Sequence, residues 1–127
     1  MRKLVLGSLV AAALCAVNVA HAGPWEDGMA AYNRGDYVPA MQVFRGMAKA
    51  GNAKAQMMLG SMYQRGQGVA KSSSRAFMWL TFAASRGDAK AKAELKAVEA
   101  TMTADDLSQA RSMMQACEVS DYRNCEY

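Results

Sequence analysis

The stretch that decides the fold of this 127-residue chain runs from Ala55 to Val69 and reads AQMMLGSMYQRGQGV. Ala55, Leu59 and Tyr63 recur at every fourth position, so they share one face of a helix. Gly60 lies beside them, although a glycine inside a helix costs about 1 kcal/mol relative to alanine. We therefore expect a neighbouring helix to approach Gly60 closely enough to compensate for that cost.

A spacing of 36 residues relates this stretch to the chain around it. Gly51 and Gly87 are 36 positions apart, whereas Tyr32 and Tyr63 are 31 apart, so the second copy has a turn that is five residues longer. A repeat of this length holds two short helices, and such repeats stack into an α-solenoid. The sequence predicts an all-α fold whose surface binds partners and does not carry out chemistry.

Capping residues and glycines separate the expected helices. Asp36, Asn52 and Thr103 are placed as N-caps, and either Ser72 or Ser73 caps the fourth helix. The expected helices cover residues 25–34, 37–50, 53–65, 73–86, 89–102 and 104–117. No segment shows the alternating pattern of a β-strand.

A set of small, aromatic and glycine positions carries a resemblance to a known repeat. These positions are Ala55, Leu59, Gly60, Tyr63, Gly66, Gly68, Val69, Ala76, Trp79, Ala83, Ala84 and Gly87. They resemble the Sel1-like repeat, a relative of the tetratricopeptide repeat, although Ala70, Ser72 and Leu80 depart from its pattern. The resemblance implies a short right-handed superhelix of antiparallel helix pairs, in which these residues are structural and the first helix of each pair lines a concave protein-binding face.

The resemblance covers most of the chain after its first residues. The expected organisation is a degenerate repeat at residues 23–52, a full repeat at 53–88 and a capping helical hairpin at 89–117, followed by a tail at 118–127.

The N-terminal residues have the pattern of an export signal. Arg2 and Lys3 precede an apolar run from Leu4 to Val19, and the small residues of Ala20-His21-Ala22 follow. This predicts a signal peptide at residues 1–22 that is cleaved between Ala22 and Gly23. The run is shorter than the ~20 residues that span a bilayer, so a stable membrane anchor is disfavoured. We expect a periplasmic or secreted protein.

Two cysteines remain once the signal peptide is removed. Cys117 and Cys125 are eight positions apart, and in an oxidising compartment the simplest reading of such a pair is a disulfide that ties the tail. The rival reading, a thiol-redox pair, would usually show Cys-x-x-Cys.

Candidate catalytic residues are few. The only histidine, His21, lies in the signal peptide, so a Ser-His-Asp or Cys-His site and the common zinc sites are excluded from the mature chain. Met57, Met58, Met62, Met113 and Met114 could suggest a soft-metal site, but methionines also fill gaps between helices, which is the reading we prefer.

We therefore predict no enzyme and no cofactor. No nucleic-acid partner is expected either, because the basic residues alternate with acidic ones. The alternative is a hydrolase of cell-wall material or β-lactams, as proposed for exported relatives that carry a cysteine pair in every repeat.

The predicted binding surface lies on the third helix. Its members are Met57, Ser61 and Gln64, which lie off the apolar stripe, and Arg65, which together with the flanking Arg34 and Lys54 favours an acidic partner. We expect another protein of the cell envelope as the partner. Self-association is a further expectation, because a stack of barely two repeats has large ends.

Overall fold

The computed structural model describes residues 22–125, and these residues form helices joined by short turns. The helices are α1 (Pro24–Asn33), α2 (Tyr37–Lys49), α3 (Ala53–Arg65), α4 (Ser73–Ser85), α5 (Ala89–Glu99) and α6 (Ala104–Val119). No residue from 22 to 125 lies in a strand, so the all-α prediction is confirmed. The predicted signal peptide falls, apart from Ala22, outside the described residues.

Side-chain caps fix where most of these helices begin. Asn52, Ser72 and Asp88 each accept a hydrogen bond from the backbone N–H three residues later, at 2.9, 3.2 and 2.8 Å. Thr103 forms a reciprocal capping box with Asp106 at the start of α6. The fourth helix is therefore capped by Ser72 and not by Ser73.

Three details differ from the expected helices. Asp36 stands at the N-cap position of α2 but makes no capping bond, because its carboxylate accepts a hydrogen bond from Arg34 Nε at 3.2 Å instead. α5 ends at Glu99, earlier than expected, and α6 continues to Val119.

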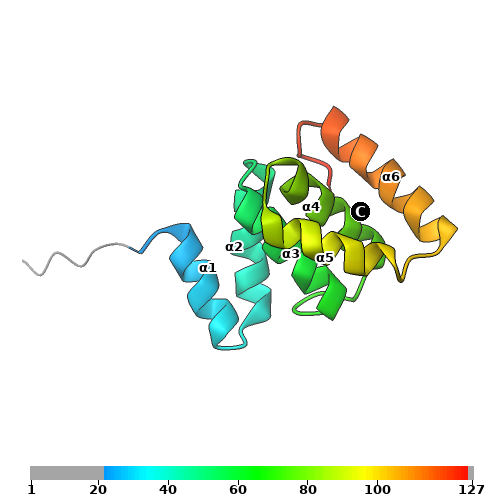
Figure 1. Cartoon of the computed structure of the whole chain (residues 1–127). Coiled ribbons are helices and arrows are strands. Elements are labelled where there is room, and N and C mark those ends of the chain that lie inside the picture. Colours follow the sequence, from blue (N-terminus) through cyan, green and yellow to red (C-terminus); the bar gives the residue numbers. More distant parts are fainter. Residues whose placement is uncertain (1–21, 126–127) are drawn as a thin grey trace, which may run out of the picture.

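Consecutive helices lie side by side from α1 to α5, and α3 is at the centre of the array (Figure 1). α3 packs against α2, α4 and α5, and nine of its thirteen residues are buried. Because it is covered on three sides, most of its circumference is core, and little of it is left as surface.

The closest helix contact joins α3 to α4. A Cβ on Gly60 would stand 2.5 Å from Leu80 Cγ and 3.2 Å from the carbonyl oxygen of Ala76. Trp79 and Ala83 are also buried in this interface region of α4. The expected close approach at Gly60 is confirmed, and it explains why a residue without a side chain is placed in mid-helix.

A glycine also sets the long turn between α3 and α4. Gly68 has φ +72°, and a Cβ there would stand 2.8 Å from the carbonyl carbon and oxygen of Tyr37. Only glycine combines this left-handed conformation with so close a backbone contact. Gly68 thus lets the segment between α3 and α4 pack against the first turn of α2.

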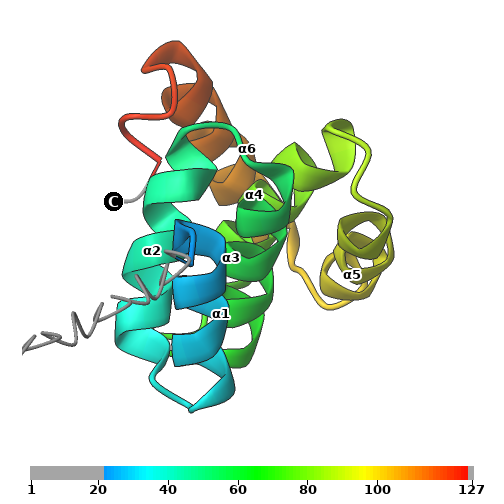
Figure 2. The ribbon, with the colours of Figure 1, turned by 90° about the vertical axis from the view of Figure 1, so that its left-hand side faces the viewer.

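The last two helices do not close the stack as the expected hairpin at residues 89–117. α5 packs against α3 and α4, whereas α6 packs against α4, and the two helices diverge from the turn between them (Figures 1 and 2). The buried residues of α6 are Ala110, Met113 and Cys117. The Ser74 hydroxyl on α4 has two acceptors within reach of its one hydrogen, the carbonyl oxygen of Asp106 at 3.1 Å and Gln109 Oε1 at 3.0 Å.

Within residues 22–125, no helix combines the length and hydrophobicity that crossing a membrane requires.

Candidate protein-binding surface

Two of the four predicted binding residues are buried. Met57 is 7% exposed and Ser61 is 3% exposed, so the expectation that they point outward is wrong. The Ser61 hydroxyl donates a hydrogen bond to Glu94 on α5 and also lies 3.7 Å from Met57 Sδ. This side of α3 is the contact with α5, and for that reason it is not available to a partner.

The other two predicted residues remain at the surface. Gln64 is half-buried and Arg65 is exposed at the C-terminal end of α3. Arg65 Nη1 lies 3.5 Å from the hydroxyl oxygen of Tyr32, which in turn donates a hydrogen bond to Gln67 Oε1 at 3.1 Å. We call Tyr32, Gln64, Arg65 and Gln67 the Tyr32–Arg65 surface.

Three chain segments hold the Tyr32–Arg65 surface in place. Tyr32 belongs to the end of α1, and its ring packs against the Tyr37 ring of α2 with centroids 5.3 Å apart. Gln67 belongs to the turn between α3 and α4, in which Gly68 lies against the backbone of Tyr37. The surface is therefore built jointly by the first helix pair and the full repeat, and it exists only when the two are stacked.

The charge of this surface is positive. Among residues 22–125 the only ion pair joins Arg34 to Asp36, at 3.2 Å, so no described carboxylate pairs with Arg65. Lys54, which the sequence also associated with an acidic partner, lies at the opposite end of α3. The guanidinium of Arg65 is thus the basic group that belongs to the surface.

Sequence reasoning missed Tyr32 and Gln67 as members of this surface. The sequence pattern places Tyr32 in the degenerate repeat and Gln67 in a turn. The extra length of that turn in the second copy is the one signal that could have pointed to a contact outside the repeat.

The structural motif residues are buried between helices or stand at helix ends. Leu59, Ala76, Trp79 and Ala83 are fully buried, Tyr63 is buried, and Ala84 is half-buried. Gly66 and Gly87 end their helices with φ of +67° and +93°. These residues hold the helices together and are not part of the Tyr32–Arg65 surface.

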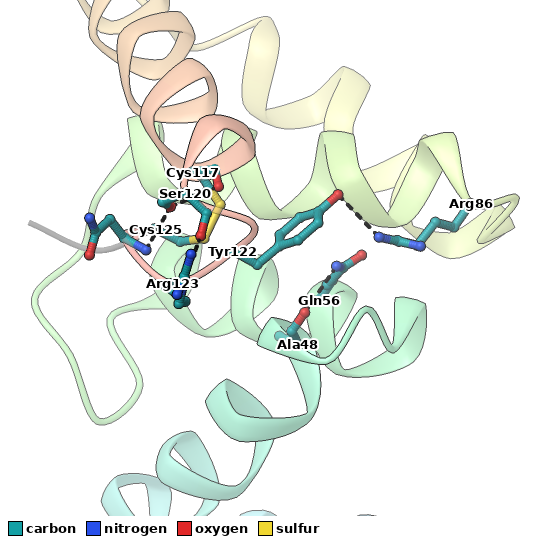
Figure 3. Close-up of a disulfide and its surroundings, with 9 residues drawn as sticks. Ala48, Gln56, Arg86, Cys117, Ser120, Tyr122, Arg123 and Cys125 are labelled. Carbon is teal, nitrogen blue, oxygen red and sulfur yellow. Dashed lines mark hydrogen bonds between the residues drawn. A yellow bond between two sulfur atoms is a disulfide. The ribbon is translucent and has the colours of Figure 1, made fainter.

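A disulfide joins Cys117 and Cys125, as predicted, and both residues are fully buried. It closes the loop after α6, and the loop is not a loose tail, because Tyr122 is half-buried within it. Figure 3 shows Tyr122 reaching from this loop towards Arg86 of the α4–α5 turn. The same view shows Gln56 of α3, whose Nε2 donates a hydrogen bond to the carbonyl oxygen of Ala48 at 3.1 Å and so joins α3 to α2.

The methionines singled out in the sequence occupy the interior. Met57, Met58, Met62 and Met113 are buried and belong to the hydrophobic core, and Met114 packs against it. The part of the chain that the structure describes contains no cluster of three or more His, Cys, Asp or Glu suited to a metal ion, and no pocket.

Comparison with known proteins identifies one part of this architecture. The family model described as Sel1 repeat matches residues 53–88, which comprise the helices α3 and α4, the turn between them and residues 86–88. No curated protein matches the chain. Sel1 repeats are generally protein–protein interaction modules and are typically non-catalytic. The chain therefore contains a Sel1 repeat, which α3 and α4 form.

Proposed function

We propose that this protein is an exported adaptor that binds another protein of the cell envelope through the Tyr32–Arg65 surface. The observation that carries the proposal is the convergence of Arg65 and Gln67 of the full repeat on Tyr32 of the preceding helix. Tyrosine and arginine are enriched among the residues that dominate binding energy at protein interfaces. Here the tyrosine ring is packed against Tyr37, which limits the freedom that binding would have to remove.

The positive charge of Arg65 favours a partner that presents a carboxylate. A guanidinium forms bidentate, charge-assisted hydrogen bonds with carboxylates, which are stronger than bonds between neutral groups. The half-buried amide of Gln64 stands one residue away on α3 and offers both a donor and an acceptor. An exposed acidic side chain of a partner protein, next to backbone or amide groups, fits this arrangement.

Binding is tested by a pair of arginine variants. Arg65→Glu reverses the charge within the surface, whereas Arg111→Glu makes the same change at an exposed position on α6. We expect partners captured from cell-envelope extract to be lost with Arg65→Glu, at least tenfold, and retained with Arg111→Glu. Equal capture by both variants, with helical circular dichroism unchanged, would reject the surface.

Export rests on the basic start, the apolar run and the Ala20-His21-Ala22 motif at the N-terminus. Cell fractionation followed by N-terminal sequencing tests it. A mature chain that begins at Gly23 in the envelope fraction supports export, and an intact chain that begins at Met1 in the cytoplasm contradicts it.

Self-association is a second expectation and has its own measurement. Solution mass recorded over a range of protein concentrations separates a monomeric adaptor from a segment of a larger assembly. The hydrolase alternative is not carried further, because no described residue favours it.

A further inference from the structure

The loop after α6 carries one aromatic residue back onto α4. The Tyr122 ring packs edge-on against the Phe82 ring, with centroids 5.4 Å apart. Arg86 Nη2 donates a hydrogen bond to the Tyr122 hydroxyl at 3.1 Å, and its guanidinium carbon lies 5.5 Å from the centre of the Tyr122 ring. Phe82 is buried in this arrangement, although it is near the end of α4. Tyr122 thus packs on Phe82 and Arg86 at the end of α4, and Figure 3 shows its hydrogen bond with Arg86.

Arg86 connects this contact to the preceding helix pair. A Cβ on Gly51, in the turn between α2 and α3, would stand 3.4 Å from Arg86 Nη2. The guanidinium therefore lies between the Gly51 turn and Tyr122. Arg86 is exposed even with Tyr122 in place, so Tyr122 contacts only one side of its guanidinium.

Two residues of the loop have an unfavourable backbone conformation when Tyr122 is packed on α4. Asp121 and Tyr122 both have positive φ, at 53° and 61°, and neither is a glycine. Residues with side chains rarely adopt this conformation, and it persists where the surrounding structure imposes it. The disulfide between Cys117 and Cys125 spans both residues and constrains them together with hydrogen bonds of the loop, such as the one from the Asn124 N–H to Ser120 Oγ at 2.9 Å.

We call Phe82 and Arg86, at the end of α4, the Phe82–Arg86 face. We propose that the Cys117–Cys125 disulfide is a redox latch: when the disulfide is formed, Tyr122 is held against this face, and when it is reduced, Tyr122 is released. In the oxidised protein the loop is closed and the face is covered. A dithiol reductant transfers two electrons and two protons, so that the sulfur–sulfur bond breaks, two cysteine thiols form and the reductant becomes a disulfide. Asp121 and Tyr122 then relax to negative φ, Tyr122 leaves, Phe82 becomes exposed, and Arg86, which is already exposed in the oxidised protein, loses its hydrogen bond to the Tyr122 hydroxyl.

Burial of the disulfide limits the rate at which it is reduced. Both cysteines are fully buried, so a reductant reaches the bond only after the loop opens transiently. The latch therefore responds slowly and stays closed during brief exposure to thiols.

The test compares four forms of the full chain: oxidised, fully reduced with dithiothreitol, Cys117→Ser/Cys125→Ser, and oxidised Tyr122→Ala. The first readout is hydrogen exchange at the Tyr122 amide, which donates to the carbonyl oxygen of Cys117 at 2.9 Å. We expect the acceleration of exchange at Tyr122 in the reduced and cysteine-free forms to be at least tenfold greater than the acceleration at the amides of α3, which reports the loss of global stability.

The second readout is modification of Arg86 by phenylglyoxal. It should be several-fold faster in the reduced, cysteine-free and Tyr122→Ala forms than in the oxidised parent, while exposed Arg111 on α6 reacts equally in all four. The Tyr122→Ala variant keeps the disulfide, so it separates loss of the cover from loss of the bond.

Three results would overturn the latch. Unchanged exchange at Tyr122 after reduction would show that the disulfide does not hold the loop. Unchanged Arg86 reactivity in Tyr122→Ala would show that Tyr122 is not the cover. Loss of protection along the whole of α6 on reduction would show a general unfolding of that helix instead of a local release.

Discussion

Gly60 of α3 lies so close to Leu80 of α4 that the two helices meet without room for a methyl group between them. A Cβ on Gly60 would stand 2.5 Å from Leu80 Cγ and 2.8 Å from Leu80 Cδ2. Both residues lie inside the complete Sel1 repeat, and Leu80 is fully buried. This contact sets the separation of the central helix pair and is the starting point for the first prediction.

Gly60→Ala should destabilise the protein. Alanine improves helix propensity by about 1 kcal/mol, but overpacking a buried interface costs typically 1–3 kcal/mol, so we expect a net loss of about 1 kcal/mol in the free energy of unfolding. Gly46→Ala is the matched control, because Gly46 is also inside a helix and has no neighbouring atom within 4 Å of the new Cβ. It should stabilise by about 0.5–1 kcal/mol. Urea denaturation measures both, and equal effects of the two changes would contradict the close contact.

Gly68→Ala should cost more than Gly35→Ala. Both glycines have positive φ, at +72° and +82°, but only Gly68 faces the backbone of Tyr37, whereas nothing lies within 4 Å of a Cβ on Gly35. Placing alanine at a positive φ costs about 1–3 kcal/mol at either position. The extra loss of unfolding free energy in Gly68→Ala, which we expect to be about 1–3 kcal/mol, therefore reports the steric contact with Tyr37. Thermal unfolding of the two variants provides the comparison. A smaller loss in Gly68→Ala than in Gly35→Ala would be inconsistent with the turn resting on α2.

The hydrogen bond between Ser61 and Glu94 should couple α3 to α5. Removing the buried Ser61 hydroxyl leaves the Glu94 carboxylate without this donor, and we expect Ser61→Ala to cost about 1 kcal/mol. A double-mutant cycle with Glu94→Ala should give a coupling energy of about 0.5–1 kcal/mol. Ser85→Ala serves as the control, because among residues 22–125 the Ser85 hydroxyl bonds to the Phe82 carbonyl oxygen in its own helix and joins no second helix. Strict additivity of Ser61→Ala and Glu94→Ala would argue against the bond.

Loss of the disulfide should lower global stability as well as release Tyr122. Its loop spans only eight positions, so chain entropy predicts somewhat less than the ~3 kcal/mol expected for fifteen residues. We expect Cys117→Ser/Cys125→Ser to lose about 2 kcal/mol in urea unfolding. Addition of a reductant should lower the stability of the parent by a similar amount and leave the variant unchanged. A parent that is insensitive to full reduction would show that the bond does not contribute.

Local signals in the sequence were sufficient to place the helices. Asn52, Ser72 and Thr103 begin helices because their side chains bond to the backbone three residues later, and this requires nothing beyond one turn of chain. Gly66 and Gly87 end helices for an equally local reason, since they adopt positive φ. Asp36 was the exception, because the nearby Arg34 competes for its carboxylate.

The binding surface was predicted only in part, because α3 is central. Met57 and Ser61 lie off the apolar stripe in the sequence and would be exposed on a helix with one covered face. In the folded chain α5 covers that side of α3, so both residues are buried, and Gln64 and Arg65 remain accessible beyond the contact. Helical periodicity shows which residues share a face, but it does not show how many faces will be covered.

The amino-acid sequence by itself determined the helices, their caps, the 36-residue repeat and the pairing of Cys117 with Cys125, because each depends on neighbours in the chain or on a recurring pattern. Only the tertiary structure decided that α6 packs on α4, that Tyr122 rests on Phe82 and Arg86, and that Arg65 meets Tyr32. These contacts join residues more than thirty positions apart, and their geometry follows from how the helices pack. No local propensity encodes that packing.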